Sequence, residues 1–469
     1  MIEGLSFDDV LLMPKRSSVQ SRKDVDTSTQ LTKNIALNIP IVSANMDTVT
    51  ESQMAIALAH TGGIGIIHRF LTIEEQVREV GRVKRAENVV IEHPYTVLPT
   101  FTVRAARRFM QTNNVSGLLV VETAGKLVGI VTARDLLFED DDSKEVRDVM
   151  STDLVTAPVA TPLSSAREIL HKNRVEKLPL VDSFGKPTGL ITSRDILNQT
   201  NFPKASKDAK GRLRVGAAVG IKDDFLERAQ ELVAAGVDVL VVDIAHGHSE
   251  GAVTAVRKLK ENFHHVELIA GNVATAEGVA DLISAGADAI KVGVGPGSVC
   301  TTRIVTGSGV PQLTAIMDCA KSAGKIPIIA DGGIKNSGDI AKAIAACASA
   351  VMIGGLLAGT DESPGFMVTR HGARYKIIRG MASLGANLSR KEKEKSERDL
   401  NDYVPEGVEA MVPYRGSAMD VISQLVGGFR SGMSYCGATS IKEMQTKAEF
   451  IKMTSAGMKE SKPHDVNLL

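Results

Sequence analysis

A glycine-rich loop that carries a cysteine is the stretch of this 469-residue chain best suited to chemistry. Gly293, Gly295 and Gly297 alternate after the strand-like run 289–292, and Cys300 stands at the tip between hydroxyl side chains. Glycines adopt conformations closed to other residues, so the backbone can approach a ligand. Such loops bind phosphate through N–H groups or a cation through carbonyls. A thiol presented there can act as a nucleophile. We expect this role for Cys300, against the alternative of a buried structural cysteine.

Two further turns predict an anion site. Asp331 precedes Gly332 and Gly333, and Gly354 and Gly355 follow a later apolar run. Such turns place free N–H groups at helix starts, where the helix dipole favours an anion. The carboxylate of Asp331 would suit the hydroxyls of a ribose. A phosphate, a ribose and a thiol together indicate a nucleoside monophosphate that is modified at its base.

The elements that must position these groups form a regular series of apolar runs, each followed by a turn and a helical stretch. The runs cover 39–44, 63–67, 215–219, 239–242, 268–270, 289–292, 326–330 and 350–353. Alternating strands and helices predict a parallel α/β fold, and eight repeats are the number of a (β/α)₈ TIM barrel. Chemistry in that fold lies on the loops after the strands. Further polar groups fall there: Asn45, Asp47, His68, Asp243, His246, His248 and Asn272.

A duplicated segment interrupts this series. Residues 129–137, with the core Thr132-Ala133-Arg134-Asp135, recur sixty positions later as residues 189–197. We therefore predict three parts: barrel residues 1–91, an inserted pair over 92–200, and barrel residues 201–469. The pair resembles a tandem of CBS motifs, a Bateman domain. That resemblance implies that Asp135 and Asp195 bind an adenine or guanine nucleotide; the alternative is that each caps the following helix.

Composition excludes several classes of protein. The formal net charge is zero, which argues against DNA binding and against an anionic membrane surface. No apolar run reaches the length of a membrane span, and the N-terminus lacks the pattern of a signal peptide. The four cysteines contain no CxxC pair, so neither a disulfide framework nor a zinc site is expected. These features predict a cytoplasmic enzyme.

Several motifs in order resemble the IMP dehydrogenase and GMP reductase family. They are Asn45–Val49, Asp243–His248, Gly271–Thr275, Gly295–Arg303, Ala330–Gly333, Arg379–Met381 and Val412–Gly416. The resemblance implies a purine nucleotide oxidoreductase in which Cys300 attacks C2 of the base. It also implies a nicotinamide cofactor, a bound K⁺ and a homotetramer or octamer.

The resemblance also implies residue roles. Thr302 and Glu409 would transfer protons, although Glu406 lies only three residues before Glu409. Substrate contacts would come from Ser298, Asp331, Gly332, Gly333, Gly354, Gly355, Gly380 and Met381. The cofactor would meet Asp243, Ala245, Asn272 and Gly293. Carbonyls of Gly295, Gly297 and Cys300 would hold K⁺.

The two reactions of this family differ in one sequence feature. The dehydrogenase activates water with an adjacent Arg-Tyr pair on a flap, and residues 386–404 contain no such pair. Asn45 and Gly354-Gly355 also resemble reductases, whereas the inserted pair, His246-Gly247-His248 and residues 431–436 resemble dehydrogenases. We expect GMP reductase with NADPH. The alternatives are IMP dehydrogenase with NAD and an inactive nucleotide sensor.

Overall fold

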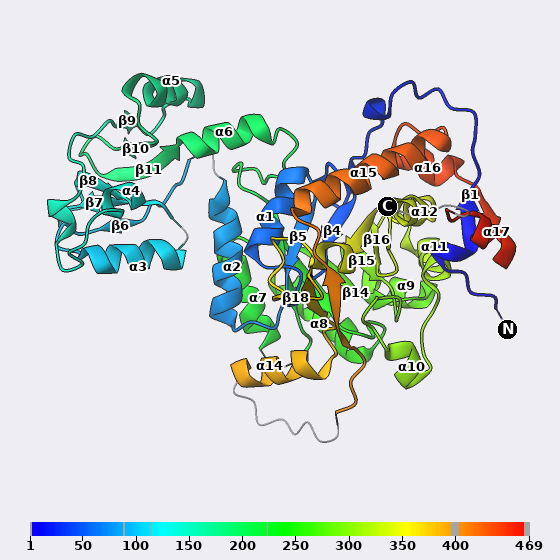
Figure 1. Cartoon of the computed structure of the whole chain (residues 1–469). Coiled ribbons are helices and arrows are strands. Elements are labelled where there is room, and N and C mark those ends of the chain that lie inside the picture. The colour runs from blue at the N-terminus through cyan, green and yellow to red at the C-terminus, as the bar shows by residue number, and fades with distance from the viewer. Residues whose placement is uncertain (1, 88–89, 114, 223, 395–402, 464–469) are drawn as a thin grey trace. The chain divides into compact units, whose positions relative to one another are not determined.

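Eight parallel strands close into a barrel (Figure 1). The computed structural model describes residues 2–87, 90–113, 115–222, 224–394 and 403–463. In spatial order the strands are β12 (Val215–Val219), β13 (Val239–Asp243), β14 (Glu267–Val273), β15 (Ala289–Val292), β16 (Ile328–Asp331), β17 (Ala350–Ile353), β4 (Ile41–Ser43) and β5 (Ile64–Ile67). All eight predicted strands are confirmed, because strands buried on both faces read as continuous apolar runs.

Helices surround the barrel in the order of a β/α repeat. They are α1 (Ser52–Thr61), α2 (Ile73–Ala86), α7 (Phe225–Ala234), α8 (Glu250–Asn262), α9 (Ala276–Ser284), α11 (Gln312–Ala323), α12 (Ser337–Ala345) and α15 (Ala418–Tyr435). Two short helices are also present: α10 (Thr302–Thr306) follows β15 after the loop 293–301, and α13 (Gly355–Ala358) begins two residues after the end of β17. Helix α15 packs against α12 and α1 and so completes the ring.

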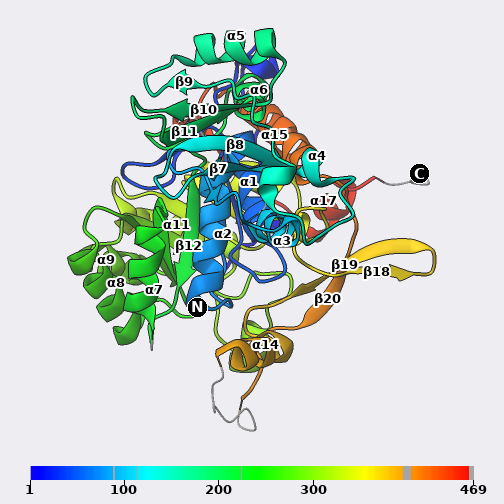
Figure 2. The same ribbon diagram turned by 90° about the vertical axis from the view of Figure 1, so that its left-hand side faces the viewer.

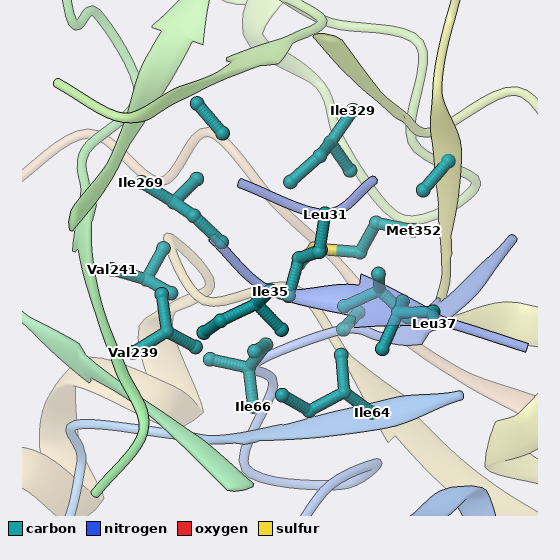
Figure 3. Close-up of a cluster of buried hydrophobic side chains, with 14 of the residues drawn as sticks. Leu31, Ile35, Leu37, Ile64, Ile66, Val239, Val241, Ile269, Ile329 and Met352 are labelled. Carbon is teal, nitrogen blue, oxygen red and sulfur yellow. The ribbon is translucent and has the colours of Figure 1, made fainter. Parts of the chain in front are cut away.

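A small hairpin fills the N-terminal end of the barrel. Strands β2 (Thr29–Gln30) and β3 (Ala36–Leu37) pair antiparallel, and Leu31, Ile35 and Leu37 pack among the inward side chains of the strands (Figure 3). All three are buried. Because this end is closed by apolar packing, the polar groups gather at the opposite end, where the strands finish.

The inserted residues form a separate compact unit with internal symmetry. Its first half contains β6 (Thr96–Val97), α3 (Val103–Asn113), β7 (Gly117–Val121), β8 (Leu127–Thr132) and α4 (Ala133–Leu136). The second half repeats the order with β9 (Ala157–Pro158), α5 (Leu163–Asn173), β10 (Lys177–Val181), β11 (Pro187–Thr192) and α6 (Ser193–Asn201). The duplication read from the sequence is therefore also a structural repeat.

The boundaries of this unit lie slightly outside the predicted 92–200. It comprises residues 84–203 and 207–213. Ion pairs explain the extension, since Lys84 binds Asp208 at 3.1 Å and Lys207 binds the buried Glu87. The entering and leaving segments are thus joined to each other within the unit.

An antiparallel sheet follows the barrel strands. It consists of β18 (Met367–Arg370), β19 (Ala373–Arg379) and β20 (Glu409–Pro413), and helix α14 (Leu384–Glu394) lies between β19 and β20 in sequence. Figure 2 shows the β18–β19 hairpin extending as an arm. The remaining elements are β1 (Val10–Leu12), which pairs with β21 (Phe450–Lys452), and helices α16 (Ile441–Lys447) and α17 (Ser455–Glu460).

No helix in the described part of the chain is long and apolar enough to cross a membrane.

The separate packing of the inserted unit leads to a prediction. Replacing residues 92–200 by a short Gly/Ser linker removes none of the eight barrel strands. We expect the shortened chain to be soluble and to unfold cooperatively, as measured by circular dichroism during heating, with the full-length chain as control. A shortened chain that lacks a cooperative transition would show that the barrel depends on the insertion.

Candidate active site

The predicted site residues lie on the loops at the C-terminal ends of the barrel strands. The loop from Gly293 to Thr301 joins β15 to α10, and it is packed tightly against the end of β16. Gly293 has φ +148°, and a Cβ there would lie 2.1 Å from the carbonyl oxygen of Asp331. This glycine is therefore required for contact between neighbouring loops, in addition to any approach to a ligand.

Cys300 begins a short chain of hydrogen bonds. Its thiol is partly exposed and donates to Thr302 Oγ1 at 3.2 Å. The Thr302 hydroxyl donates in turn to Glu406 Oε2 at 2.8 Å. A thiol, a hydroxyl and a carboxylate in series can pass a proton from the nucleophile to the carboxylate and back.

The carboxylate that accepts from Thr302 is that of Glu406, and not that of Glu409, which the sequence predicted. Glu409 starts β20 opposite Arg379, and its Oε1 lies only 1.8 Å from where a Cβ on Gly385 would be. Glu406 comes earlier, where its carbonyl accepts from Thr301 N at 2.9 Å. The segment before β20 runs beside the cysteine loop, so Glu406 lies next to Thr302, and Glu409 at the start of the strand does not.

The residues expected around a phosphate are brought together. Ser298 Oγ lies 3.2 Å from where a Cβ on Gly355 would be, and α13 begins at Gly355. Gly332 and Gly333 have φ of +91° and +81°. Contrary to expectation these two do not start a helix, because α12 begins only at Ser337 after the cap residue Asn336. They form an open left-handed turn, and Gly332 packs against Pro296 of the cysteine loop.

The residues expected at the base lie on the other side of the cysteine loop. Gly380 donates its N–H to the carbonyl of Val408 at 3.0 Å, and a Cβ at Gly380 would lie 3.0 Å from the carbonyl oxygen of Val299. Met381 follows it and is partly exposed. Arg379 anchors this segment through an ion pair with the buried carboxylate of Asp47 at 2.6 Å.

A buried lysine that the sequence analysis did not identify lies at the centre of the site. Lys291 in β15 is 1% exposed and donates to Asp243 Oδ1 at 2.6 Å and to Asp331 Oδ2 at 2.7 Å. It also donates to Asn272 Oδ1. The only signal in the sequence was a lysine within the otherwise apolar run 289–292.

This network explains the charge states of the site. Burial disfavours the lysine's charge, but the carboxylates of Asp243 and Asp331 outweigh it and raise the pKa of Lys291. Burial acts against the Asp243 charge too, yet Lys291 and a hydrogen bond from Asn45 lower its pKa. At neutral pH the lysine is therefore protonated and Asp243 ionised.

Three of the four expected cofactor residues belong to the Lys291 network. Asn272 Nδ2 donates to Asp331 Oδ2 at 2.9 Å and to the Gly293 carbonyl at 2.8 Å, so it connects Asp331 to the cysteine loop. Asp243 accepts a hydrogen bond directly from Lys291. Ala245 lies apart from the network, exposed on the loop after β13.

Asp135 and Asp195 each lie at the third position of a helix, in a capping box whose N-cap residue is a threonine. Asp135 Oδ2 accepts from the backbone and hydroxyl of Thr132, each at 2.7 Å, and Asp195 Oδ2 repeats the arrangement with Thr192. Both carboxylates therefore take part in helix capping, although the cap residues themselves are Thr132 and Thr192, and nucleotide binding by the inserted unit stays a prediction.

Comparisons with known proteins agree with this geometry. Residues 4–464 match the sequence profile of the "IMP dehydrogenase / GMP reductase domain". An inosine-5'-monophosphate dehydrogenase from Nitrosopumilus maritimus is 60% identical, covering 100% of this chain and 99% of that protein. A GMP reductase from Leishmania donovani is 50% identical, covering 100% and 98%. The structure of GMP reductase from Trypanosoma brucei with guanosine 5'-monophosphate is 47% identical, covers 100% and 99%, and has a TM-score of 0.93.

The Lys291 network gives a stability prediction. In Lys291→Met the carboxylates of Asp243 and Asp331 lose their cation, so we expect a loss of about 3–5 kcal/mol in the free energy of unfolding, measured by urea denaturation. The control is Lys321→Met, which removes an exposed ion pair with Asp318 and should change the free energy of unfolding by about 1 kcal/mol or less. Equal effects of the two substitutions would contradict a central role for Lys291.

Proposed function

The chain belongs to the IMP dehydrogenase / GMP reductase family, and we propose that its reaction is the NADPH-dependent reduction of GMP to IMP and ammonia. The observation that carries this proposal is the relay from Cys300 through Thr302 to Glu406, in a chain whose segment 386–404 has no Arg-Tyr pair. The relay can protonate a departing amine, whereas the pair is what the family uses to activate water. Arg398, the arginine nearest to Tyr403, lies outside the described residues.

The first step follows from the direction of the hydrogen bonds. The thiol proton of Cys300 passes to Thr302 as the hydroxyl proton of Thr302 passes to Glu406. The thiolate then forms a C–S bond at C2 of GMP. The C2–N bond breaks, and the amino group leaves as ammonia with the proton returned through Thr302. Atoms balance in this step: GMP and the thiol give a covalent Cys300 thioimidate and ammonia.

The second step consumes the covalent intermediate. NADPH would supply the hydride that forms the C2–H bond of IMP, and Cys300 would leave as a thiolate as the C–S bond breaks. The groups suited to hold a nicotinamide are the carboxylate of Asp243 and the side-chain oxygen of Asn272, because both can accept a hydrogen bond from a carboxamide or a ribose hydroxyl. Lys291 keeps both groups fixed beside the cysteine loop.

The remaining assignments follow the same geometry. Ser298, Gly333 and Gly355 would hold the phosphate, Asp331 the ribose, and Gly380 with Met381 the base. The side-chain hydrogen bonds of Asp331 to described residues all use Oδ2, which leaves Oδ1 toward a ribose. Carbonyl oxygens are ligands that suit K⁺, so Gly295, Gly297 and Cys300 are chemically appropriate for it.

The inserted unit no longer favours the dehydrogenase. The alignment with the Leishmania donovani GMP reductase covers the whole of this chain, the insertion included. IMP dehydrogenase remains the second candidate because a relative with that name is 60% identical. In that reaction the same covalent intermediate would form by hydride loss from IMP and would be hydrolysed by water.

Absorbance at 340 nm distinguishes these functions. With GMP, NADPH and K⁺ we expect the signal to fall with release of ammonia, and we expect no reaction in Cys300→Ala. A rise with IMP and NAD⁺, without activity on GMP, would overturn the proposal in favour of the dehydrogenase. Inactivity with both substrate pairs would favour the nucleotide sensor.

The corrected carboxylate can be tested with a matched pair of variants. Glu406→Gln removes the proton acceptor of Thr302, so kcat with GMP should fall about 100-fold or more. Glu409→Gln makes the same chemical change in strand β20, away from the relay, and should retain most of the activity. The reverse ranking in kcat would restore Glu409 as the catalytic carboxylate.

A further inference from the structure

Tyr403 joins two parts of the chain on either side of residues 388–402. Its hydroxyl donates to the carbonyl of Ala382 at 2.7 Å, just before α14. The same hydroxyl accepts from Asn387 Nδ2, within α14, also at 2.7 Å. A single phenolic group therefore connects the beginning of α14 to the chain that leads into Glu406.

The carbonyl of Ala382 also holds Glu406. The Glu406 N–H donates to that oxygen at 3.1 Å, while the Glu406 carbonyl accepts from Thr301 N at 2.9 Å. The backbone of Glu406 is thus fixed on one side to the cysteine loop and on the other to Ala382. Tyr403 and Glu406 share an acceptor, so the position of one constrains the other.

The segment that supplies this acceptor is itself well ordered by hydrogen bonds. Ser383 is buried, donates its N–H to the Gly380 carbonyl at 2.9 Å and accepts from Ala386 N at 3.2 Å. Ala382 is therefore held between the base-lining residue Gly380 and the first turn of α14. A fixed acceptor can position the groups that bind to it.

The environment of Tyr403 favours its donor form. Burial and then the nearby charge of Glu406 raise the pKa of the phenol, which keeps the hydroxyl protonated at neutral pH. The phenol can therefore donate to Ala382 under the conditions in which the relay operates.

We propose that Tyr403 is a positioning residue, which holds the backbone of Glu406 through Ala382 so that the carboxylate meets Thr302. The inference rests on the proposed role of Glu406 in proton transfer. Small displacements of a catalytic group are costly, since a shift of about 1 Å can reduce a rate by roughly 100-fold. The sequence Asp402-Tyr403 has no adjacent arginine, so this tyrosine is not part of a water-activating pair.

The test is Tyr403→Phe in the full-length chain. Losing the shared hydrogen bonds should lower kcat with GMP about tenfold, while KM for GMP stays within about twofold because phosphate and ribose are held elsewhere. The control is Tyr414→Phe, which loses an exposed hydrogen bond from a residue just after β20 to Asp361 at 2.7 Å. A kcat for Tyr403→Phe equal to that of the control would overturn the proposal.

A double variant separates positioning from general structure. If Tyr403 acts through Glu406, adding Tyr403→Phe to Glu406→Gln should lower kcat by less than about twofold further. Full additivity would show that Tyr403 acts independently of Glu406 and would refute the proposal.

A readout without turnover keeps this test apart from the proposed function. Residues 388–402 contain several lysines and arginines, so trypsin cleavage there reports how firmly the flanking residues are joined. We expect Tyr403→Phe to be cut several-fold faster than wild type and Tyr414→Phe at the wild-type rate. If the protein is inactive on GMP but Tyr403→Phe is cut faster than wild type, the link through Tyr403 is retained and the reductase function is rejected. If Tyr403→Phe is cut at the wild-type rate, the link through Tyr403 is itself rejected.

Discussion

The buried charge of Lys291 constrains the arrangement of the active end of the barrel. An ammonium group inside a protein is stable only when charged and hydrogen-bonding partners surround it. Here the partners are Asp243, Asn272 and Asp331, at the ends of three strands other than its own. Because successive strand residues face opposite ways, a one-residue shift of β15 would turn the lysine away from them. The ion network therefore specifies the register of four neighbouring strands.

That register also positions the loop that carries Cys300. Two residues after Lys291 the chain reaches Gly293, whose carbonyl is bound by Asn272 of the same network. The other side of the cysteine loop is held by the segment before β20, where Val408 N donates to the Val299 carbonyl at 2.9 Å. The loop that carries Cys300 is thus held on one side by the Lys291 network and on the other by the segment before β20. Glu406 belongs to this segment before β20.

The sequence was sufficient for the barrel strands and for the glycine turns, and insufficient for two central side chains. The strands were predictable because burial on both faces demands apolar runs, and the positive φ of Gly293, Gly332 and Gly333 is closed to most side chains. Lys291 was missed because a lysine in an apolar run gives no indication of partners on other strands. Glu409 was predicted in place of Glu406 because the segment before β20 is irregular. No helical or strand periodicity there indicates which of the two glutamates faces Thr302. In both cases the deciding contacts are distant in sequence.

In the mechanism proposed above, the same scaffold suits either reaction of the family because both would pass through one covalent intermediate, and the choice would depend on what reacts with C2 next. Hydrolysis would require a water-activating group, and residues 386–404 contain no Arg-Tyr pair. Reductive deamination requires only the relay that is already in place, since the thiol proton returns to the departing amine. A carboxylate fixed from both sides, as Glu406 is by Thr301 and Ala382, serves a relay that stays in one position throughout the cycle. The hydrogen bonds of the Glu406 backbone to Thr301 and Ala382 therefore suit the proton transfer proposed for its carboxylate.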